Sequence, residues 1–281
     1  MIGIASTIRS AAVGLVAFAG LSAVAISSAQ AQAIGIASSN PGSLYHSSAS
    51  AIAKVVNDHA GLQATVQPFA SATIYLPAIA AGEYAVGPTN VEELRVAVLG
   101  ERWYNGRKYE DLRSVAIMYP LRNGVFVRAD SDIKTVADLK GKRLTTGYTS
   151  QKTIPPIIDG VLATAGLTQD DVGPVQVPNV GAGANAFIEG KADAFIVAHG
   201  AAKVREADAA VGGLRSINIP NTPENLAAIQ KHFPPSYLKE EKAGKNNPGV
   251  TDPIHVLTYD AVVAASTKTP VDVVYRLTKA M

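Results

Sequence analysis

Residues 34–45 read IGIASSNPGSLY, and residues 143–154 read RLTTGYTSQKTI. Each stretch is a short apolar strand that runs into a polar, glycine-containing loop, and each loop opens a helix. A helix-turn-strand of similar sequence follows one element later, at residues 78–86 and 186–195. Because the first N–H groups of a helix have no partner inside it, each loop can receive a polar ligand. The repeated order predicts two similar lobes that grip a small polar ligand from both sides.

Strands and helices alternate along the rest of the chain, as judged from the spacing of its apolar residues. Further strands are predicted at residues 63–68, 84–86, 115–119, 124–128, 142–145, 175–177, 194–198, 214–219 and 255–265. Helices are predicted at residues 43–58, 72–82, 154–166, 220–233 and 269–281. This alternation is typical of an α/β fold in which each lobe has a mostly parallel sheet flanked by helices.

Three segments are predicted to interrupt this order. Residues 103–110 are polar and aromatic and are expected to form an exposed insertion. Residues 234–253 are rich in Lys, Glu, Asn, Gly and Pro and are expected to form a loop. Pro77 lies inside the helix expected at residues 72–82, so we expect that helix to start late or to kink.

The composition is that of a folded protein with balanced charge. Hydrophobic residues make up 47% of the 281 residues and charged residues 17%, which supplies ample material for a core. The formal net charge is +2, and phosphate binding needs a clustered basic surface. Composition therefore argues against nucleic acid as a partner, and the length suits one large domain or two moderate ones.

Residues 1–33 are predicted to be a signal peptide. Arg9 ends a short n-region, residues 11–26 are apolar, and Ala29-Gln-Ala31 and Ala31-Gln-Ala33 offer small-x-small cleavage patterns. A membrane anchor is the alternative, but this apolar run is shorter than the roughly 20 residues that a spanning helix needs. The chain has no cysteine, which excludes an acylated cysteine and disulfides. We therefore predict a soluble periplasmic protein that is cleaved near Ala31 or Ala33.

Several segments resemble one family of transport receptors. They are Tyr45 after the Gly42-Ser43 turn, Val66-Gln67 before Ser71, Ala81-Gly82-Glu83, LRSVAIMYP (112–120), FVRADSDIKTVADLKGKRL (126–144) and GKADAFIVA (190–198). In order and combination they resemble the TAXI family of TRAP-transporter solute receptors, periplasmic proteins that deliver ligands to an ion-driven permease. The resemblance covers essentially all of the chain after residue 33.

The resemblance implies a two-lobed type II periplasmic binding protein-like fold with the ligand cleft between the lobes. The implied ligand is a small organic anion, either a dicarboxylate or a glutamate-like amino acid, and the implied partner is a TRAP permease. We place lobe 1 at residues 34–122 and 256–281 and lobe 2 at residues 123–255. Relatives continue with more helix beyond the point that matches residue 281, so lobe 1 is expected to be shortened. We expect a monomer with no cofactor and no enzymatic activity.

Two departures from the family leave the identity of the ligand open. The glycine-rich first loop of the family is replaced by residues 38–45 (SSNPGSLY), and its glycine-rich second loop by residues 147–153 (GYTSQKT). Both loops become bulkier and richer in hydrogen-bonding side chains.

The second loop supplies five candidate ligand-binding residues. A carboxylate at this helix start would meet unpaired N–H groups, hydroxyls, the positive end of the helix dipole and one ammonium. The alternative is that Ser150 or Thr153 only caps the helix. The candidates are Thr149, Ser150, Gln151, Lys152 and Thr153.

The first lobe supplies eight further candidates from equivalent positions. These lie on the first loop, before the helix expected at residues 72–82, and after the strand expected at residues 84–86. Helix capping, turn formation and packing are the alternatives, since Ser, Thr and Asn favour such positions. The candidates are Ser39, Asn40, Ser43, Tyr45, Ser71, Thr73, Thr89 and Asn90.

Tyr119 and His199 complete the set of candidates. Tyr119 ends a predicted strand near the expected crossing between the lobes, where its ring could pack on a ligand or on the core. His199 follows a predicted strand at the carboxyl edge, where ligands of α/β sheets bind; a histidine satisfied at a turn is the alternative. The other four histidines lack metal-ligand spacing, so no metal site is predicted.

Two other classes of function remain as alternatives. The first is a receptor for an ATP-driven importer of the same superfamily. The second is a secreted enzyme on the same fold, for which a pairing of His199 with Ser150 or Tyr45 is the only arrangement to examine. Residues 181–186 (GAGANA) match the dinucleotide fingerprint in form, but the helix after them is too short and no acidic residue ends the next strand.

Overall fold

The computed structural model describes residues 32–245 and 247–281. The predicted signal peptide lies outside the described residues except for Gln32 and Ala33, which begin the first strand. Residues 31–281 form one compact unit. Within the described ranges, no helix is both long and apolar enough to cross a bilayer.

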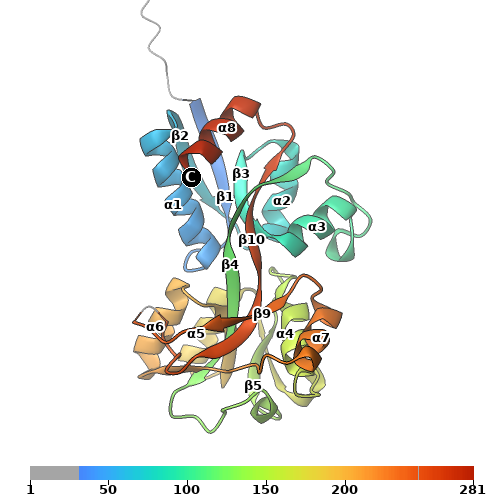
Figure 1. The fold of residues 1–281 in the computed structure, drawn as a ribbon, viewed down its shortest axis with the longest axis vertical. Helices are drawn as coiled ribbons and strands as arrows, with labels where there is room; N and C mark the ends of the chain where they lie inside the picture. Colours follow the sequence, from blue (N-terminus) through green and yellow to red (C-terminus); the bar gives the residue numbers. More distant parts are fainter. Residues whose placement is uncertain (1–31, 246) are drawn as a thin grey trace, which may run out of the picture. The chain divides into compact units, whose positions relative to one another are not determined.

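One ten-stranded sheet runs through this unit. Its strands are β1 (Gln32–Ser38), β2 (Leu62–Pro68), β3 (Val86–Asn90), β4 (Leu112–Arg128), β5 (Arg143–Gly147), β6 (Gly173–Val177), β7 (Ala194–Ala198), β8 (Leu214–Ser216), β9 (Tyr237–Glu241) and β10 (Ile254–Ser266). The order is β2-β1-β3-β10-β4-β7-β5-β6, with β8 beside β4 and β9 beside β10. Strand β1 is parallel to β2 and β3, and β5 is parallel to β6 and β7. The long strands β4 and β10 pair antiparallel and connect the two parallel blocks (Figure 1).

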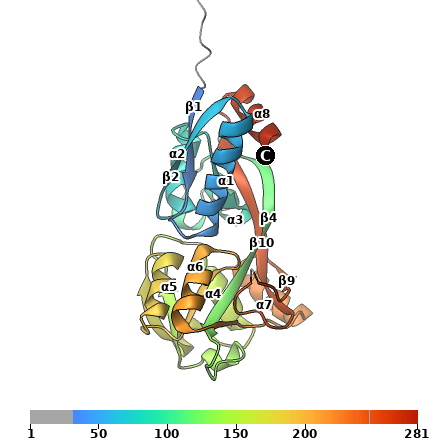
Figure 2. The ribbon, with the colours of Figure 1, turned by 90° about the vertical axis from the view of Figure 1, so that its left-hand side faces the viewer.

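Helices flank each parallel block and give the two lobes that the sequence predicts (Figures 1 and 2). The helices are α1 (Leu44–His59), α2 (Ala72–Ala81), α3 (Val91–Leu99), α4 (Ile154–Ala163), α5 (Val180–Ile188), α6 (Ala202–Val211), α7 (Pro223–His232) and α8 (Val271–Ala280). Helices α1, α2, α3 and α8 belong to the first lobe, and α4, α5, α6 and α7 to the second. Each lobe buries its own apolar clusters against the sheet. The predicted two-lobed α/β fold is therefore confirmed, with antiparallel crossing strands in addition to its parallel blocks.

The crossing strand β4 differs from its prediction. Two strands separated by a turn were expected at residues 115–119 and 124–128, but one strand of 17 residues spans both. Pro120 lies opposite Asp260, and the register with β10 shifts next to this pair, between Ala261 and Val262. The extended conformation of proline fits a strand, and Pro120 lies where β4 pairs with β10 alone, since its pairing with β7 begins at Asn123. The boundaries proposed for the lobes fall inside β4 and β10 and stay a prediction.

Three further segments differ from expectation in whole or in part. Helix α3 was not predicted, although Asn90 caps it by accepting from the backbone N–H of Glu93. Strand β9 lies within residues 234–253, which were expected to form a loop. Residues 103–110 are mostly exposed, as predicted, but the Tyr104 side chain is buried against the cluster that α2 and α3 share.

Helix α2 accommodates Pro77 without the predicted late start, since it begins at Ala72. A proline inside a helix removes the hydrogen bond to the carbonyl four residues earlier, which here belongs to Thr73. The Tyr104 hydroxyl donates to that carbonyl at 3.3 Å. The buried Tyr104 therefore supplies a partner for the carbonyl that Pro77 leaves without its helical hydrogen bond.

Candidate functional site

Hydrogen bonds join the two lobes where α2 and α4 begin. The Ser71 hydroxyl, at the N-cap of α2, donates to the carbonyl oxygen of Ser150. The Thr153 hydroxyl, at the N-cap of α4, donates to Oε1 of Glu93 at 2.5 Å. Both bonds connect residues that lie on opposite sides of the crossing strands, so the two lobes are in direct contact here.

A small polar cavity lies beside these bonds. Its volume is about 40 Å³, and a single water needs about 10–15 Å³ of such space. It is therefore large enough for only a few heavy atoms. The residues around it are Ser39, Tyr45, Ser71, Ala72, Asn90, Glu93, Gln151, Thr153, Ile154 and Tyr259.

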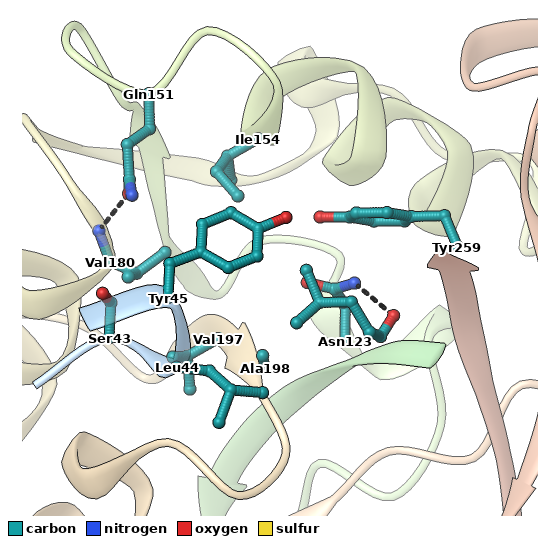
Figure 3. A pocket seen from close by; sticks show the side chains of 11 residues that line it. Ser43, Leu44, Tyr45, Asn123, Gln151, Ile154, Val180, Val197, Ala198 and Tyr259 are labelled. Atoms are coloured by element: carbon teal, nitrogen blue, oxygen red, sulfur yellow. Dashed lines mark hydrogen bonds between the residues drawn. The ribbon is translucent and has the colours of Figure 1, made fainter. Parts of the chain in front are cut away.

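A second, more apolar cavity of about 60 Å³ adjoins the first (Figure 3). The two cavities share four lining residues: Tyr45, Gln151, Ile154 and Tyr259. The hydroxyls of Tyr45 and Tyr259 point toward one another (Figure 3). The other residues that line the second cavity are Ser43, Leu44, Leu121, Asn123, Val180, Val197 and Ala198. The paired cavities are thus walled by both lobes, with a polar end and an apolar end.

Glu93 is the charged residue of the polar cavity, and its side chain is 4% exposed. Its Oε1 accepts from the hydroxyls of Thr153 at 2.5 Å and Thr73 at 3.4 Å. Its Oε2 accepts from the Thr89 hydroxyl at 3.2 Å and from Nδ2 of Asn90 at 2.8 Å. Among the described residues, no Lys, Arg or His forms an ion pair with this carboxylate. Burial raises the pKa of Glu93 above its ordinary value of 4.5, and the four hydrogen bonds oppose that rise.

Four tyrosines lie around this carboxylate, and its negative charge contributes to raising the pKa of each of them. Burial raises the pKa of Tyr75, Tyr104 and Tyr259, and the negative charge of Glu93 is the next cause. Burial also raises the pKa of Tyr45, with smaller contributions from Tyr259 and Glu93. The Tyr75 hydroxyl is not available to a ligand, because it already donates a hydrogen bond to the carbonyl of Pro88. Among the described residues, the buried Tyr45 hydroxyl makes no hydrogen bond of standard geometry, and Asn90 is its polar neighbour, so the hydroxyl is available to a ligand.

The start of α4 offers fewer backbone donors than the sequence analysis assumed. Pro155 and Pro156 occupy its first turn and have no N–H. The N–H of Ile154 donates to the carbonyl of Gln151, and the N–H of Ser150 donates to the carbonyl of Pro178. This helix start therefore offers a carboxylate fewer free N–H groups than expected, and ligand binding by this loop stays a prediction.

Gln151 contributes to the lining of both cavities through its side chain rather than through its backbone N–H. Its Oε1 accepts from the backbone N–H of Val180 at 2.7 Å (Figure 3). That bond holds the side chain over the boundary between the two cavities and leaves Nε2 as the donor for a ligand. The loop before it contains Tyr148, which is buried and has a φ of 35°, in the region that disfavours side chains.

The fifteen candidates fall into four groups, of which the last is Tyr119 with His199. Seven line a cavity between the lobes: Ser39, Ser43, Tyr45, Ser71, Asn90, Gln151 and Thr153. Four others lie around this site without lining it. Thr73 and Thr89 donate to Glu93, and Ser150 contributes its carbonyl. The Asn40 side chain lies against Gly181 of α5, and its buried Oδ1 has no hydrogen-bond partner in the described part of the chain. Thr149 and Lys152 are exposed and line neither cavity.

Tyr119 and His199 lie at a separate pocket beside the crossing strands, which they line with Arg122 and Lys239. The Tyr119 hydroxyl is hydrogen-bonded to Ser48 at 2.7 Å. His199 is 1% exposed, and its Nε2 is paired with the Ser216 hydroxyl at 3.1 Å. Burial lowers the pKa of His199 from 6.5 to about 3, with a smaller contribution from Arg122. His199 is thus a neutral, buried residue and is not paired with Ser150 or Tyr45.

Sequence reasoning missed Glu93 and Tyr259. One signal for Glu93 was present, since Asn90 followed three residues later by Glu93 is the pattern of a capping box. The pattern marks a helix start after β3 and places a carboxylate there, but it does not show that the carboxylate becomes buried. Tyr259 lies inside a long apolar strand, where no local pattern separates a lining residue from a core residue. The residues of the apparent dinucleotide fingerprint lie inside α5 and form no loop.

Comparison with known proteins identifies the family and the fold. The model of a family described as the NMT1-like family matches residues 36–281. The alkanesulfonate-binding protein SsuA from Xanthomonas axonopodis pv. citri, bound to MOPS, is 18% identical with a TM-score of 0.53, over 90% of this chain and 74% of that chain. AbpA, an amino acid ABC transporter substrate-binding protein from Streptococcus pneumoniae bound to L-arginine, is 15% identical with a TM-score of 0.51, over 88% and 86%.

A third structure, the periplasmic aliphatic sulphonate binding protein SsuA from Escherichia coli, is 19% identical with a TM-score of 0.44. The match covers 66% of this chain, which spans 56% of the length of that protein. Similarities at these levels of identity concern the fold alone.

Proposed function

The chain belongs to the NMT1-like family, and from this membership and the two-lobed fold we propose that it is an extracytoplasmic solute receptor. Its lobes close on a small organic ligand, and the closed form delivers that ligand to a membrane transporter. The observation that carries the proposal is the pair of cavities walled by both lobes beside the bonds Ser71–Ser150 and Thr153–Glu93.

Ligand binding favours closure of the lobes, because the residues that line the cavities come from both lobes. A ligand that contacts both lobes binds the closed form more tightly than the open form, and it shifts the population by that difference in affinity. Tyr45 contributes from the first lobe, Gln151 and Ile154 from the second, and Tyr259 from a crossing strand. No covalent chemistry is required for this cycle.

The ligand in this proposal is a small organic anion, either a dicarboxylate or a glutamate-like amino acid. Its carboxylate would accept from neutral donors: the hydroxyls of Ser39, Tyr45 and Tyr259 and Nε2 of Gln151. A buried carboxylate needs such hydrogen bonds, because it loses its hydration on entering the closed cleft. Lys152 is not among these donors, since it is exposed and lines neither cavity.

The transporter in this proposal is a TRAP-type permease, on the basis of the resemblance to the TAXI family. A receptor for an ABC importer is a second candidate with comparable support. AbpA, described as the substrate-binding protein of an amino acid ABC transporter, shares the fold. The genes next to this one distinguish the two candidates, since a TRAP system places an ion-coupled permease there and an ABC system an ATPase.

The proposed location is the periplasm, with removal of the signal peptide after Ala31. Gln32 and Ala33 pair with Leu62 and Gln63 in the sheet, and Oε1 of Gln32 accepts from the Arg276 guanidinium at 3.0 Å. Cleavage after Ala31 would preserve these contacts, whereas cleavage after Ala33 would remove them. The mass of the secreted protein distinguishes the two sites.

The proposal includes no enzymatic activity. The rival reading, a secreted enzyme, needs a nucleophile beside a base in the cleft. His199 is paired with Ser216 and faces a different pocket from the cavities between the lobes. Turnover of an ester or amide panel that is lost in His199→Ala would favour the enzyme instead.

A thermal-shift panel of carboxylates and amino acids tests the proposal most simply. A ligand present at 100 times its dissociation constant stabilises the folded protein by about 2.7 kcal/mol. We expect at least one organic anion or amino acid to raise the melting temperature, and neutral sugars to have no effect. A panel in which only sugars or inorganic cations raise it would contradict the proposed ligand class.

A further inference from the structure

Two adjacent glutamates at the start of α3 differ in their electrostatic surroundings. Glu92 is 1% exposed, and its carboxylate lies 2.9 Å from Nε of Arg95 and 3.6 Å from Nε of Arg102. Glu93 is almost as buried, but its four partners are the neutral side chains already described. One buried carboxylate therefore has cationic partners, and the one that borders the cavity has none among residues 32–245 and 247–281.

This difference matters because a buried charge is costly unless another charge compensates for it. Three of the four donors to Glu93 are hydroxyls, whose hydrogen bonds are weaker than those from a charged nitrogen. The bond from Thr73 is 3.4 Å long and is the weakest of the four. A charged nitrogen in the cavity could replace the Thr73 hydroxyl at Oε1 and neutralise the carboxylate at the same time.

The part of the site away from Glu93 fits the remaining groups of a ligand whose charged nitrogen binds Glu93. Within the described part of the chain, the buried Tyr45 hydroxyl makes no hydrogen bond of standard geometry, and it points toward the Tyr259 hydroxyl (Figure 3). Both tyrosines line the two cavities. Two phenols in this arrangement can donate to one carboxylate. Beyond them, Leu121, Val180 and Val197 give the second cavity an apolar wall that fits a short hydrocarbon group.

We propose that Glu93 recognises a protonated nitrogen on the ligand, and so selects α-amino acids and similar zwitterions over carboxylates that lack an amine. This inference rests on the proposed function as a solute receptor and narrows its ligand class. A plain dicarboxylate brings no cation to Glu93 and places its own negative charge in the same closed space. Glu93 is thus the residue that excludes dicarboxylates.

Matched pairs of compounds that differ only in the amine test this inference. We would measure dissociation constants calorimetrically for L-glutamate against glutarate and for L-leucine against 4-methylpentanoate. The wild-type protein should bind the amine-bearing member of a pair about 10- to 100-fold more tightly, as expected for a hydrogen bond to a buried charged group. This comparison needs no variant, so it stands even if a substitution prevents folding.

The variant Glu93→Gln keeps the shape of the side chain and removes its charge. We expect it to weaken binding of the amine-bearing member about 10- to 100-fold and to leave or improve binding of the other member. Glu92→Gln is the matched control, because it removes a buried carboxylate from the same helix turn outside the cavities. It should leave the preference within a pair unchanged.

Two results would overturn the inference, and they are distinguishable. If glutarate or 4-methylpentanoate binds as tightly as its amine-bearing counterpart, Glu93 does not select a cation, while the receptor function stands. A second result is that no member of either pair binds and no carboxylate or amino acid of the thermal-shift panel raises the melting temperature. In that case the proposed ligand class fails, and this inference fails with it.

Discussion

At the scale of single residues, the Glu93 carboxylate dominates the site. It touches side chains from both lobes, and it influences the pKa values of the four tyrosines around it. Residue type and spacing could predict many of its neighbours, because Ser, Asn and Thr at loop ends are candidates from sequence alone. Glu93 itself was missed because helix α3, whose first turn carries it, was not predicted.

The raised pKa of Glu93 predicts an unusual dependence of stability on pH. In the unfolded chain the group loses its proton near pH 4.5, whereas in the folded protein it keeps the proton to a higher pH. The folded state therefore binds more protons in that window, and stability falls as pH rises above 4.5, by at most about 1.4 kcal/mol per pH unit.

Urea denaturation of the ligand-free protein between pH 4.5 and 8 checks this prediction. The free energy of unfolding of the wild type should fall relative to that of Glu93→Gln as the pH rises. A difference that stays constant over this range would show that Glu93 titrates normally in the folded protein.

His199 predicts a dependence of the opposite sign. Its pKa is about 3 in the folded protein against 6.5 in an unperturbed histidine, so the unfolded chain binds the extra proton between these values. The stability contributed by neutral His199 is complete above pH 6.5 and is lost as the pH falls toward 3, by at most about 1.4 kcal/mol per pH unit. Denaturation of His199→Asn should show a shallower loss between pH 6.5 and 4 than the wild type, and parallel curves would contradict the assignment.

At the scale of secondary-structure elements, the sequence predicted what local patterns determine. The alternation of strands and helices, the loop before α1 and the loop before α4 all follow from apolar spacing and turn residues. Local patterns do not reveal that Pro120 lies within a continuous crossing strand, because only pairing with β10 stabilises the strand through that residue. The two prolines in the first turn of α4 were visible in the sequence, and they should have reduced the number of backbone donors expected there.

Helix α2 supplies a prediction at this scale. Tyr104→Phe removes the hydroxyl that donates to the Thr73 carbonyl, which Pro77 leaves without its helical partner. We expect a loss of about 1 kcal/mol in the free energy of unfolding. Tyr109→Phe is the control, because that ring packs on the same cluster and its hydroxyl makes no hydrogen bond among the described residues. Equal stabilities of the two variants would show that the bond to Thr73 contributes nothing.

At the scale of the whole molecule, the two lobes are joined by β4 and β10 and held together by a few hydrogen bonds at the cleft. Thr153→Val removes one of these bonds and should shift the ligand-free protein toward an open form by about 10-fold in population. Thr164→Val, at the other end of α4, is the matched control and should cause no shift. Solution scattering would report the shift as a larger radius of gyration for Thr153→Val alone. An unchanged radius would contradict a role for this bond in closure.

The distance between the lobes in the presence and absence of ligand tests the central claim most directly. The chain has no cysteine, so Ser50→Cys in α1 and Ala209→Cys in α6, both exposed positions, introduce two unique sites for spin labels. The tightest-binding compound of the amino acid and carboxylate panel should narrow the label-to-label distance distribution and shift it to the shorter distances of the closed form. A compound that binds by calorimetry but leaves the distribution unchanged would contradict a receptor that works by closing its lobes on a ligand.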